Sequence, residues 1–287
     1  MRTISGVRLL LMTSLLATGG SRAKALTAGY ESVSSRSSES IRVAGAGSWR
    51  VASDGTRTTV GHADATGSWS VSVPGRFRLP VVTSRGLRAG PSLDGAALVL
   101  ASLPQQGPSS WHSAFVVVTR SANTTLPLSG RWMFDAVSPN GQTLFLTESV
   151  GPNRYWVRPV DVATGRIGDR LVTKSIAAAP TRVAVEDGPM EGLPIDRVTS
   201  PDGHVVFTLY DGPAHPFVHA LDTQNGGAIC YDLPQPLQIL AGALRLRLGP
   251  DAGTVDVVHN RRVVVQVTGS SSRWGPSVRT VDAKVPQ

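Results

Sequence analysis

The sequence Ser200-Pro201-Asp202-Gly203 leads into the short apolar run Val205-Val206-Phe207-Thr208-Leu209-Tyr210. The same pattern stands at Ser138-Pro139-Asn140-Gly141, before Thr143-Leu144-Phe145-Leu146-Thr147. Proline presets φ near about −65° at the second position of a turn, Asp or Asn accepts the third, and glycine takes the left-handed conformation. Such a turn joins two antiparallel strands. Both runs are β-branched and aromatic and too short for helices, so each stretch predicts a strand, a tight turn and a second strand.

The Asp/Asn-Gly marker of this turn recurs along the chain. Its copies are Asp54-Gly55, Asp94-Gly95, Asn140-Gly141 and Asp202-Gly203, with a degraded copy at Asp251-Ala252-Gly253. The intervals are 40, 46, 62 and 49 residues, and a period of about 40 to 50 residues with four short strands is typical of a β-propeller blade. We therefore expect an all-β chain that forms a single propeller of five or six four-stranded blades. The longest interval contains residues 173–194, which we expect to form a long loop.

The two best repeats resemble a known family. Ser-Pro-Asp-Gly-His-Val-Val-Phe at 200–207, Ser-Pro-Asn-Gly-Gln-Thr-Leu-Phe at 138–145 and Val-Asp-Val-Ala-Thr-Gly at 160–165 are similar to the blade pattern of secreted bacterial YVTN/TolB-like propellers, which have WD40-like repeats. The resemblance covers roughly residues 130–235. It implies an interaction or scaffold protein and supplies no catalytic residue.

The N-terminus has the three parts of a secretory signal. Arg2 and Arg8 form a basic region, residues 9–17 are apolar, and Ala23-Lys24-Ala25 is a small-x-small cleavage site. We expect residues 1–25 to be a signal peptide that is cleaved near Ala25, residues 26–40 to be a Ser-rich flexible leader, and residues 41–287 to be the propeller. The apolar stretch is shorter than the roughly 20 residues that span a bilayer. The protein is therefore expected to be secreted or extracytoplasmic, with no transmembrane segment in the mature chain.

The charge of the chain does not indicate nucleic-acid binding. The formal net charge is +8, and the expected signal peptide contains four cations and no acid, so the mature chain is near +4. The basic residues are scattered singly rather than gathered into a stripe, which favours a solvated basic surface over a phosphate-binding one. Cys230 is the only cysteine, so no intramolecular disulfide is possible and we expect a buried, inert thiol.

A second recurrence concerns binding. A Gly-Pro pair follows three of the markers, in the expected loop between the second and third strands of a blade: Gly107-Pro108, Gly151-Pro152 and Gly212-Pro213. In a propeller these loops share one face, and we expect them to converge at the mouth of the central channel, where ligands commonly bind. The candidate binding residues beside them are Trp111, His112, Asn153, Arg154, Tyr155, Asp211 and His215. The alternative is that Gly-Pro only makes the loops compact.

Chemical motifs are scarce. The chain has no Gly-x-Ser-x-Gly elbow, no phosphate-binding glycine loop with lysine and no His-Glu-x-x-His helix. His215, His219 and Asp211 offer too few ligands for an expected zinc site, so no metal or cofactor is predicted. Asp135 and Asp196 occupy equivalent positions in consecutive repeats, which favours a repeated structural role over a catalytic pair.

The sequence thus favours a secreted, non-enzymatic binding module that recognises an extracellular protein or glycan on the face of the Gly-Pro loops. The alternative is a propeller enzyme that acts on an extracellular carbohydrate or another small molecule. Paired acids at the channel mouth would favour the enzyme. A rim of aromatic and Arg side chains without paired acids would favour binding.

Overall fold

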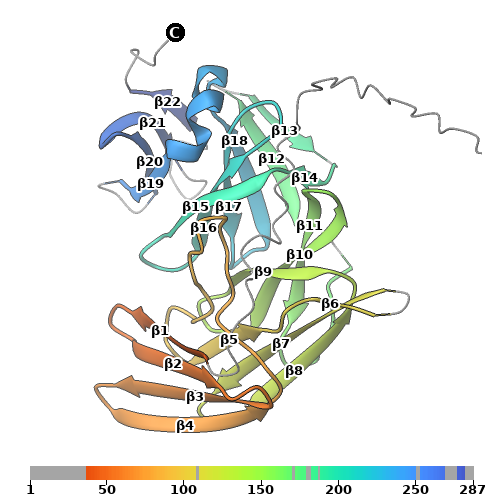
Figure 1. Ribbon diagram of the computed structural model, residues 1–287. Coiled ribbons are helices and arrows are strands. Elements are labelled where there is room, and N and C mark those ends of the chain that lie inside the picture. Colours follow the sequence, from red (N-terminus) through yellow and green to blue (C-terminus); the bar gives the residue numbers. More distant parts are fainter. Residues whose placement is uncertain are drawn as a thin grey trace, which may run out of the picture.

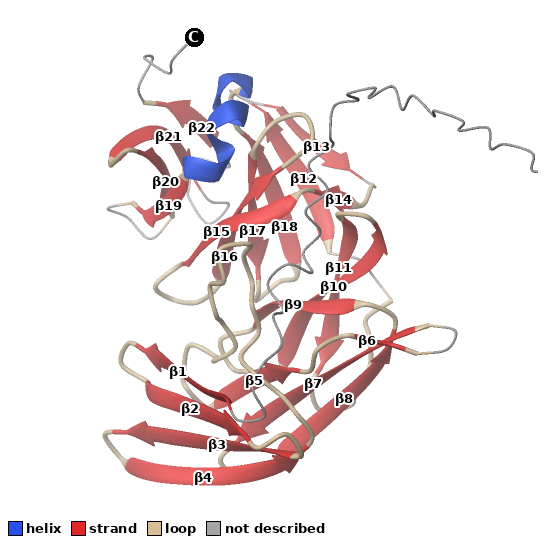
Figure 2. Ribbon diagram, in the orientation of Figure 1, coloured by secondary structure: helices blue, strands red, loops and turns tan. Residues whose placement is uncertain are grey.

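The computed structural model describes residues 37–107, 110–169, 172–178, 182–186, 188–249, 253–268 and 277–281. Its strands form five consecutive sheets, which follow one another in an arc (Figure 1; Figure 2). The helix of this part of the chain is the 3-10 helix η2 (Gln235–Ala243). No helix of the described residues is long and apolar enough to cross a membrane. The all-β fold with four-stranded propeller blades is confirmed, and five sheets fall within the predicted five or six.

Each sheet is built mainly from strands that are neighbours in the sequence. The first contains β1 (Ser37–Val43), β2 (Gly47–Ser53), β3 (Arg57–Asp64) and β4 (Gly67–Pro74), and the second β5 (Ala97–Ala101), β6 (Gln105–Gln106), β7 (Trp111–Thr119) and β8 (Asn123–Ser129). The third contains β9 (Trp132–Val137), β10 (Thr143–Gly151), β11 (Arg154–Asp161) and β14 (Met190–Glu191). The fourth contains β12 (Thr173–Ala178), β13 (Arg182–Glu186), β15 (Leu193–Thr199), β16 (Val205–Asp211), β17 (Phe217–Asp222) and β18 (Gly227–Asp232). The fifth contains β19 (Arg245–Leu248), β20 (Thr254–His259), β21 (Arg262–Thr268) and β22 (Ser277–Thr280).

Apolar side chains between successive sheets hold the arc together. Four buried clusters lie between the first and second, second and third, third and fourth, and fourth and fifth sheets. Among the described residues no such cluster joins the fifth sheet to the first, and Figure 1 shows these two sheets at the two ends of the arc. The free faces of both end sheets are polar: Ser68, Ser70 and Ser72 are exposed on β4, and Arg247 pairs with Asp256 on the fifth sheet.

A hairpin crosses the space inside the arc. Residues 78 and 91 each pair with β5, so the two segments together take the place of an inner strand of the second sheet. The chain between them forms a hairpin, in which Val81 pairs with Arg88. At its tip the Ser84 N–H donates to Pro194 O at 2.8 Å. The Arg85 guanidinium donates to Leu244 O at 3.0 Å and also to Gly242 O. The hairpin therefore ties the second sheet to the fourth sheet and to the end of η2.

Acidic side chains on the inner strands each reach the next inner strand around the axis. Glu39 accepts a hydrogen bond from the Leu79 N–H at 2.8 Å, and Asp196 accepts one from the Leu246 N–H at 2.9 Å. Asp135, 2% exposed, forms an ion pair with the buried Arg197 of β15. Asp135 and Asp196 thus make different contacts, one with a guanidinium and one with a backbone N–H, and each joins one sheet to the next.

The structure corrects two expectations about segments. Strand β1 begins at Ser37, so the last four residues of the expected leader belong to the first sheet. The rest of that leader and the whole expected signal peptide lie outside the described residues. Residues 173–194 are not a plain loop: β12 pairs with β13 and runs parallel to β18, at the outer edge of the fourth sheet. The outer position of the third sheet is taken by the two-residue β14, which pairs with β11.

Candidate functional site

The Gly-Pro loops lie at the opposite ends of the strands from the Ser-Pro turns. Strand β10 begins after the turn 138–141 and ends at Gly151, where Pro152 and Asn153 lead into β11. Strand β16 begins after the turn 200–203 and ends before Gly212-Pro213, which lead towards β17. The described residues therefore have a turn face, with the Ser-x-Asp/Asn-Gly turns, and a loop face, with the Gly-Pro loops. Gly107 precedes β7 at the same end, and Pro108 lies outside the described residues.

The loop face contains a cleft of about 570 Å³ between the second and third sheets. We call it the second–third cleft. The Arg131 guanidinium carbon lies 5.3 Å from the centre of the Trp111 ring, which is a cation–π contact. Asn153 has a φ of 53°, a left-handed conformation that asparagine tolerates better than most residues. The walls that matter for recognition are formed by Trp111, Arg131, Met133, Asn153, Arg154 and Tyr155.

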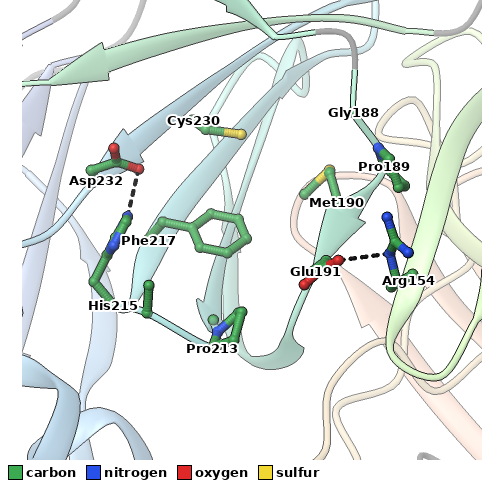
Figure 3. Close-up of a pocket in the computed structure, with 12 residues that line it drawn as sticks. Arg154, Gly188, Pro189, Met190, Glu191, Pro213, His215, Phe217, Cys230 and Asp232 are labelled. Atoms are coloured by element: carbon green, nitrogen blue, oxygen red, sulfur yellow. Dashed lines mark ion pairs between the residues drawn. The ribbon is translucent and has the colours of Figure 1, made fainter.

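A neighbouring cleft of about 370 Å³ lies between the third and fourth sheets (Figure 3). We call it the third–fourth cleft. Arg154 lines both clefts, and its Nε donates to Glu191 Oε1 at 2.6 Å. On the other side His215 Nε2 lies 3.0 Å from Asp232 Oδ1. Each carboxylate that lines this cleft is therefore paired with a basic side chain. Figure 3 shows Phe217 between these two pairs.

A group of buried aromatic rings connects the two clefts, since Tyr155 lines one cleft and Phe217 lines the other. The Tyr210 and Phe217 rings are stacked with their centres 5.0 Å apart, and Tyr155 lies 5.9 Å from Tyr210. Burial raises the pKa of both tyrosines well above the ordinary value of 10.0. Their phenols are therefore neutral at any physiological pH, and the rings serve as a rigid base for the clefts.

The structure brings together some of the predicted site residues but not all. Trp111, Asn153, Arg154 and Tyr155 line the second–third cleft, and Arg154 and His215 line the third–fourth cleft. His112 is exposed, and its Nε2 lies 3.2 Å from the Ser110 hydroxyl. Asp211 instead accepts a hydrogen bond from Gln238 of η2 at 3.1 Å. These two residues line neither cleft.

The expected convergence of the Gly-Pro loops at the channel mouth is not observed. The loops open into two clefts between successive sheets, whereas the pocket on the inner strands is lined by other residues, including Arg42, Arg88, Leu93, Pro139 and Arg197. The physical reason is that β11 and β17, which follow the loops, are the third strands of their sheets and lie away from the axis. The loops therefore sit above the inter-sheet cores.

Sequence reasoning missed three residues of the clefts: Arg131, Glu191 and Asp232. Arg131 stands in the connection between β8 and β9, which runs along the loop face, so its position between sheets was a usable signal. Glu191 meets Arg154 only because β14 pairs with β11 across more than thirty residues of chain. No local pattern indicates that pairing.

His215 and His219 are candidates for a metal site because they are four residues apart in the sequence. No group of three or more His, Cys, Asp or Glu residues in the described part of the chain could hold a metal ion. His215 precedes β17 and pairs with Asp232, whereas His219 is buried within β17, where its Nδ1 lies 3.5 Å from Cys230 Sγ. The two histidines therefore serve different sites.

Comparison with known proteins gives a likeness of fold. No family model matches the chain, and no curated protein matches it. Among solved structures it is similar to TolB from Acinetobacter baumannii, with 12% identity over 84% of this chain and 56% of that one and a TM-score of 0.39. It is also similar to the β-propeller domain of the trilobed protease from Pyrococcus furiosus, with 10% identity, 86% and 84% coverage and a TM-score of 0.38. A prolyl endopeptidase structure matches with 10% identity over 87% of this chain but 37% of that one, at a TM-score of 0.46.

The chain thus spans just over half of the Acinetobacter TolB and about a third of the endopeptidase. It resembles TolB-like and other β-propellers at the level of fold. These structures include a TolB protein and peptidases. The assignment of the fold rests on the sheets described above.

Proposed function

We propose that this protein is an exported, non-enzymatic binding module whose extracellular partner sits on the loop face. The observation that carries the proposal is the pair of adjoining clefts that share Arg154 and open on one face. Their rims combine an aromatic ring, two arginines and an asparagine, which are side chains that commonly anchor partners. The supporting β-sheets give these side chains a rigid base, as is usual for loops that bind.

The carboxylates in the clefts favour binding over hydrolysis. Glu191 pairs with Arg154, and Asp232 pairs with His215. A glycosidase needs one carboxylic acid that is protonated and one free carboxylate, held on either side of the bond to be cleaved. Each of these carboxylates already holds a basic side chain, so the described cleft does not present the two free, facing carboxyl groups that a glycosidase uses.

Exposed apolar side chains on the same face also support a partner surface. Val150 is 48% exposed beside the Gly151-Pro152 loop. Ile239 is 80% exposed on η2, which is tied to the loop after β16 through Gln238 and Asp211. Isolated exposed apolar residues are common, but Val150 adjoins Gly151 of the second–third cleft, and Ile239 adjoins Gln238, which donates to Gly212 O of the third–fourth cleft.

Site-specific photo-crosslinking tests the proposal. A benzophenone amino acid is placed at Val150 on the loop face or, as a matched control, at His204 on the turn face, and the secreted chain is irradiated in its native extracellular fraction. We expect a discrete cross-linked species from Val150 and none from His204. Equal cross-linking from both positions, or none from Val150 and from a second loop-face position at Ile239, would contradict the proposal.

A further inference from the structure

The second–third cleft has an unbalanced charge. Its lining residues include Arg131 and Arg154 and no carboxylate. The third–fourth cleft, in contrast, contains two basic and two acidic side chains that pair with each other. A positive cleft with apolar walls attracts an anionic group, and desolvation within it strengthens the interaction relative to an open surface.

The Arg131 side chain is positioned by its contact with the Trp111 ring. Its guanidinium lies over the Trp111 ring, and no carboxylate among the described residues pairs with it. A guanidinium stacked on an aromatic ring keeps its N–H donors in the plane of the group, where they can bind a carboxylate through two parallel hydrogen bonds. The stacking also limits the side-chain entropy that would be lost on binding.

Arg154 supplies a second set of donors. Its ion pair with Glu191 uses Nε, and Glu191 lines the third–fourth cleft but not the second–third cleft. Glu191 therefore holds Arg154 through Nε, which leaves the two terminal nitrogens of the guanidinium as donors for a ligand. The side chain is 52% exposed, so a ligand can reach it.

The other walls distinguish a peptide from a sugar. A sugar ring binds best to an uncovered aromatic face, but Arg131 already lies over Trp111. Met133 and Tyr155 instead offer an apolar wall for a side chain, since a thioether adapts to varied shapes. The Asn153 amide has both a donor and an acceptor, which can pair with the N–H and C=O of an extended backbone.

We infer that the second–third cleft binds an acidic peptide segment, in which an Asp or Glu carboxylate meets Arg131 and Arg154 and an adjacent apolar side chain packs on Met133 and Tyr155. The inference rests on the proposed function, because it names the kind of partner for the loop face. Charge complementarity selects the peptide: acidic segments are attracted, and basic ones are repelled by both arginines.

Peptide binding by the whole chain tests this inference. Fluorescence anisotropy is measured with a labelled octapeptide, Gly-Ser-Glu-Phe-Glu-Leu-Ser-Gly, and with its counterpart carrying Lys at both Glu positions, alongside an array of random octapeptides. We expect acidic peptides to dominate the array and the Glu peptide to bind at least about tenfold more tightly than the Lys peptide. Raising the NaCl concentration from about 50 to about 300 mM should weaken binding of the Glu peptide.

Variants locate the binding. Arg131→Gln and Arg154→Gln should each weaken binding of the Glu peptide about tenfold, because each variant loses charge-assisted hydrogen bonds to the carboxylate. The control Arg166→Gln removes an exposed arginine that pairs with Asp169 on the opposite face and should change nothing. An unchanged melting temperature shows that each variant is folded.

Three results would overturn the inference. They are equal binding of Glu and Lys peptides, an array without acidic preference, and binding of an oligogalacturonate, an acidic glycan, more tightly than any peptide and with the same dependence on Arg131. If any of these results is found while the wild-type chain still cross-links at Val150, the proposed function stands and only the acidic-peptide inference fails. If the wild-type chain neither binds the Glu peptide nor cross-links from Val150 and Ile239, the proposed function fails as well.

Discussion

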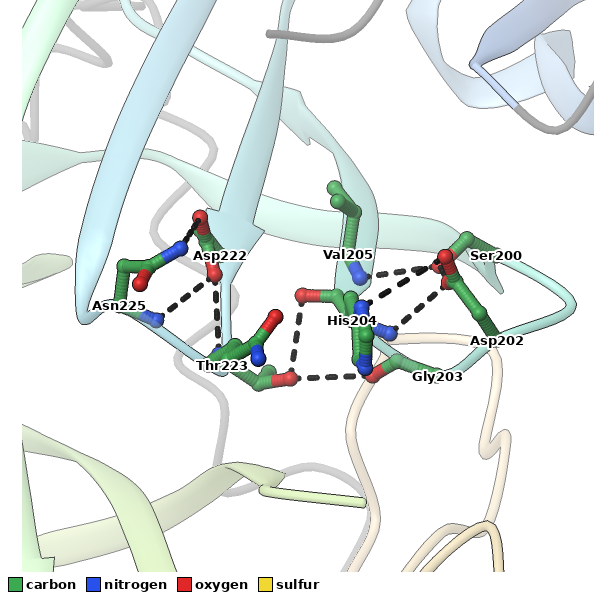
Figure 4. A network of polar contacts seen from close by, with 9 residues as sticks. Ser200, Asp202, Gly203, His204, Val205, Asp222, Thr223 and Asn225 are labelled. Carbon is green, nitrogen blue, oxygen red and sulfur yellow. Dashed lines mark hydrogen bonds and ion pairs between the residues drawn. The ribbon is translucent and has the colours of Figure 1, made fainter. Parts of the chain in front are cut away.

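The turn face and the loop face use polar groups in opposite ways. On the turn face the side chains satisfy each other: Ser200 donates to Asp202 at 2.6 Å, and the Val205 N–H donates back to Ser200 at 2.9 Å (Figure 4). On the loop face Arg131 lies over the Trp111 ring and has no ion-pair partner among the described residues, and the ion pair of Arg154 with Glu191 uses Nε. Polar groups that are satisfied internally stabilise the fold, and those with donors to spare are suited to bind. The repeated Ser-x-Asp/Asn-Gly turns of this sequence therefore mark structure, whereas the candidate site lies at the opposite ends of the same strands.

The turn face repeats one hydrogen-bond pattern three times. Ser92, Ser138 and Ser200 are each buried, and each donates to the Asp or Asn two residues later. Each serine hydroxyl also accepts an N–H from the residue five positions later. Thr223 adds a bond to the Gly203 carbonyl at 3.0 Å. The Ser-x-Asp/Asn-Gly pattern of the sequence therefore identifies a turn whose polar groups form hydrogen bonds with one another.

Substituting the turn glycine should have the largest effect on stability. Gly203 has a φ of 73°, and a Cβ there would lie 2.8 Å from a Leu93 side-chain carbon. We expect Gly203→Val to destabilise the protein by about 1 to 3 kcal/mol through backbone strain and crowding. Urea unfolding measures this change in the free energy of unfolding.

The matched control for this prediction is on the loop face. Gly151 has no positive φ, and an added Cβ would meet only the Arg154 side chain at 3.6 Å. Gly151→Ala should therefore change stability by less than about 0.5 kcal/mol. If both variants lost the same stability, the contrast between the faces would be wrong.

The buried serine of the turn should have the next largest effect. Ser200→Ala leaves the Val205 N–H without its acceptor, and an unsatisfied buried donor costs about 1 to 3 kcal/mol. Ser110→Ala, which removes an exposed hydroxyl beside His112 on the loop face, should cost little. Thermal unfolding of the two variants compares them directly, and a larger loss for Ser110→Ala would break the comparison.

The smallest effect concerns pH. The Ser200 hydroxyl and then the His204 N–H donate to Asp202 and hold the pKa of its carboxyl below the ordinary value of 3.8. A lowered folded-state pKa contributes stability that is complete above pH 3.8 and is lost as pH falls through the folded value. Because the Asp202 side chain is 57% exposed, the contribution is small.

Asparagine already occupies the equivalent position at Asn140, so Asp202→Asn should keep the turn and remove this titration. The melting temperature of the wild type should therefore fall faster than that of Asp202→Asn between about pH 5 and about pH 2. Parallel curves would show that the carboxylate does not titrate with folding.

Local signals in the sequence predicted the part of the fold that is local. The turns and the strands that follow them were readable, since proline, glycine and the Asx residue act within four positions. The parallel pairing of β12 with β18 could not be predicted from the sequence, because the pairing of distant strands depends on tertiary packing. The candidate site was predicted in part for the same reason. The Gly-Pro loops identified Trp111, Asn153 and Arg154, but Arg131 and Glu191 meet them only in the folded chain.

The most direct test of the contrast between the faces is the affinity of face-specific variants for the partner that cross-links at Val150. The account predicts that Trp111→Ala, Arg154→Ala and His215→Ala each weaken binding by about tenfold or more, because aromatic and arginine anchors dominate interface energies. Their melting temperatures should stay near that of the wild type, whereas Gln142→Ala and His204→Ala on the turn face should change neither quantity. Equal losses of affinity from both faces, or unfolding of the loop-face variants, would contradict the account.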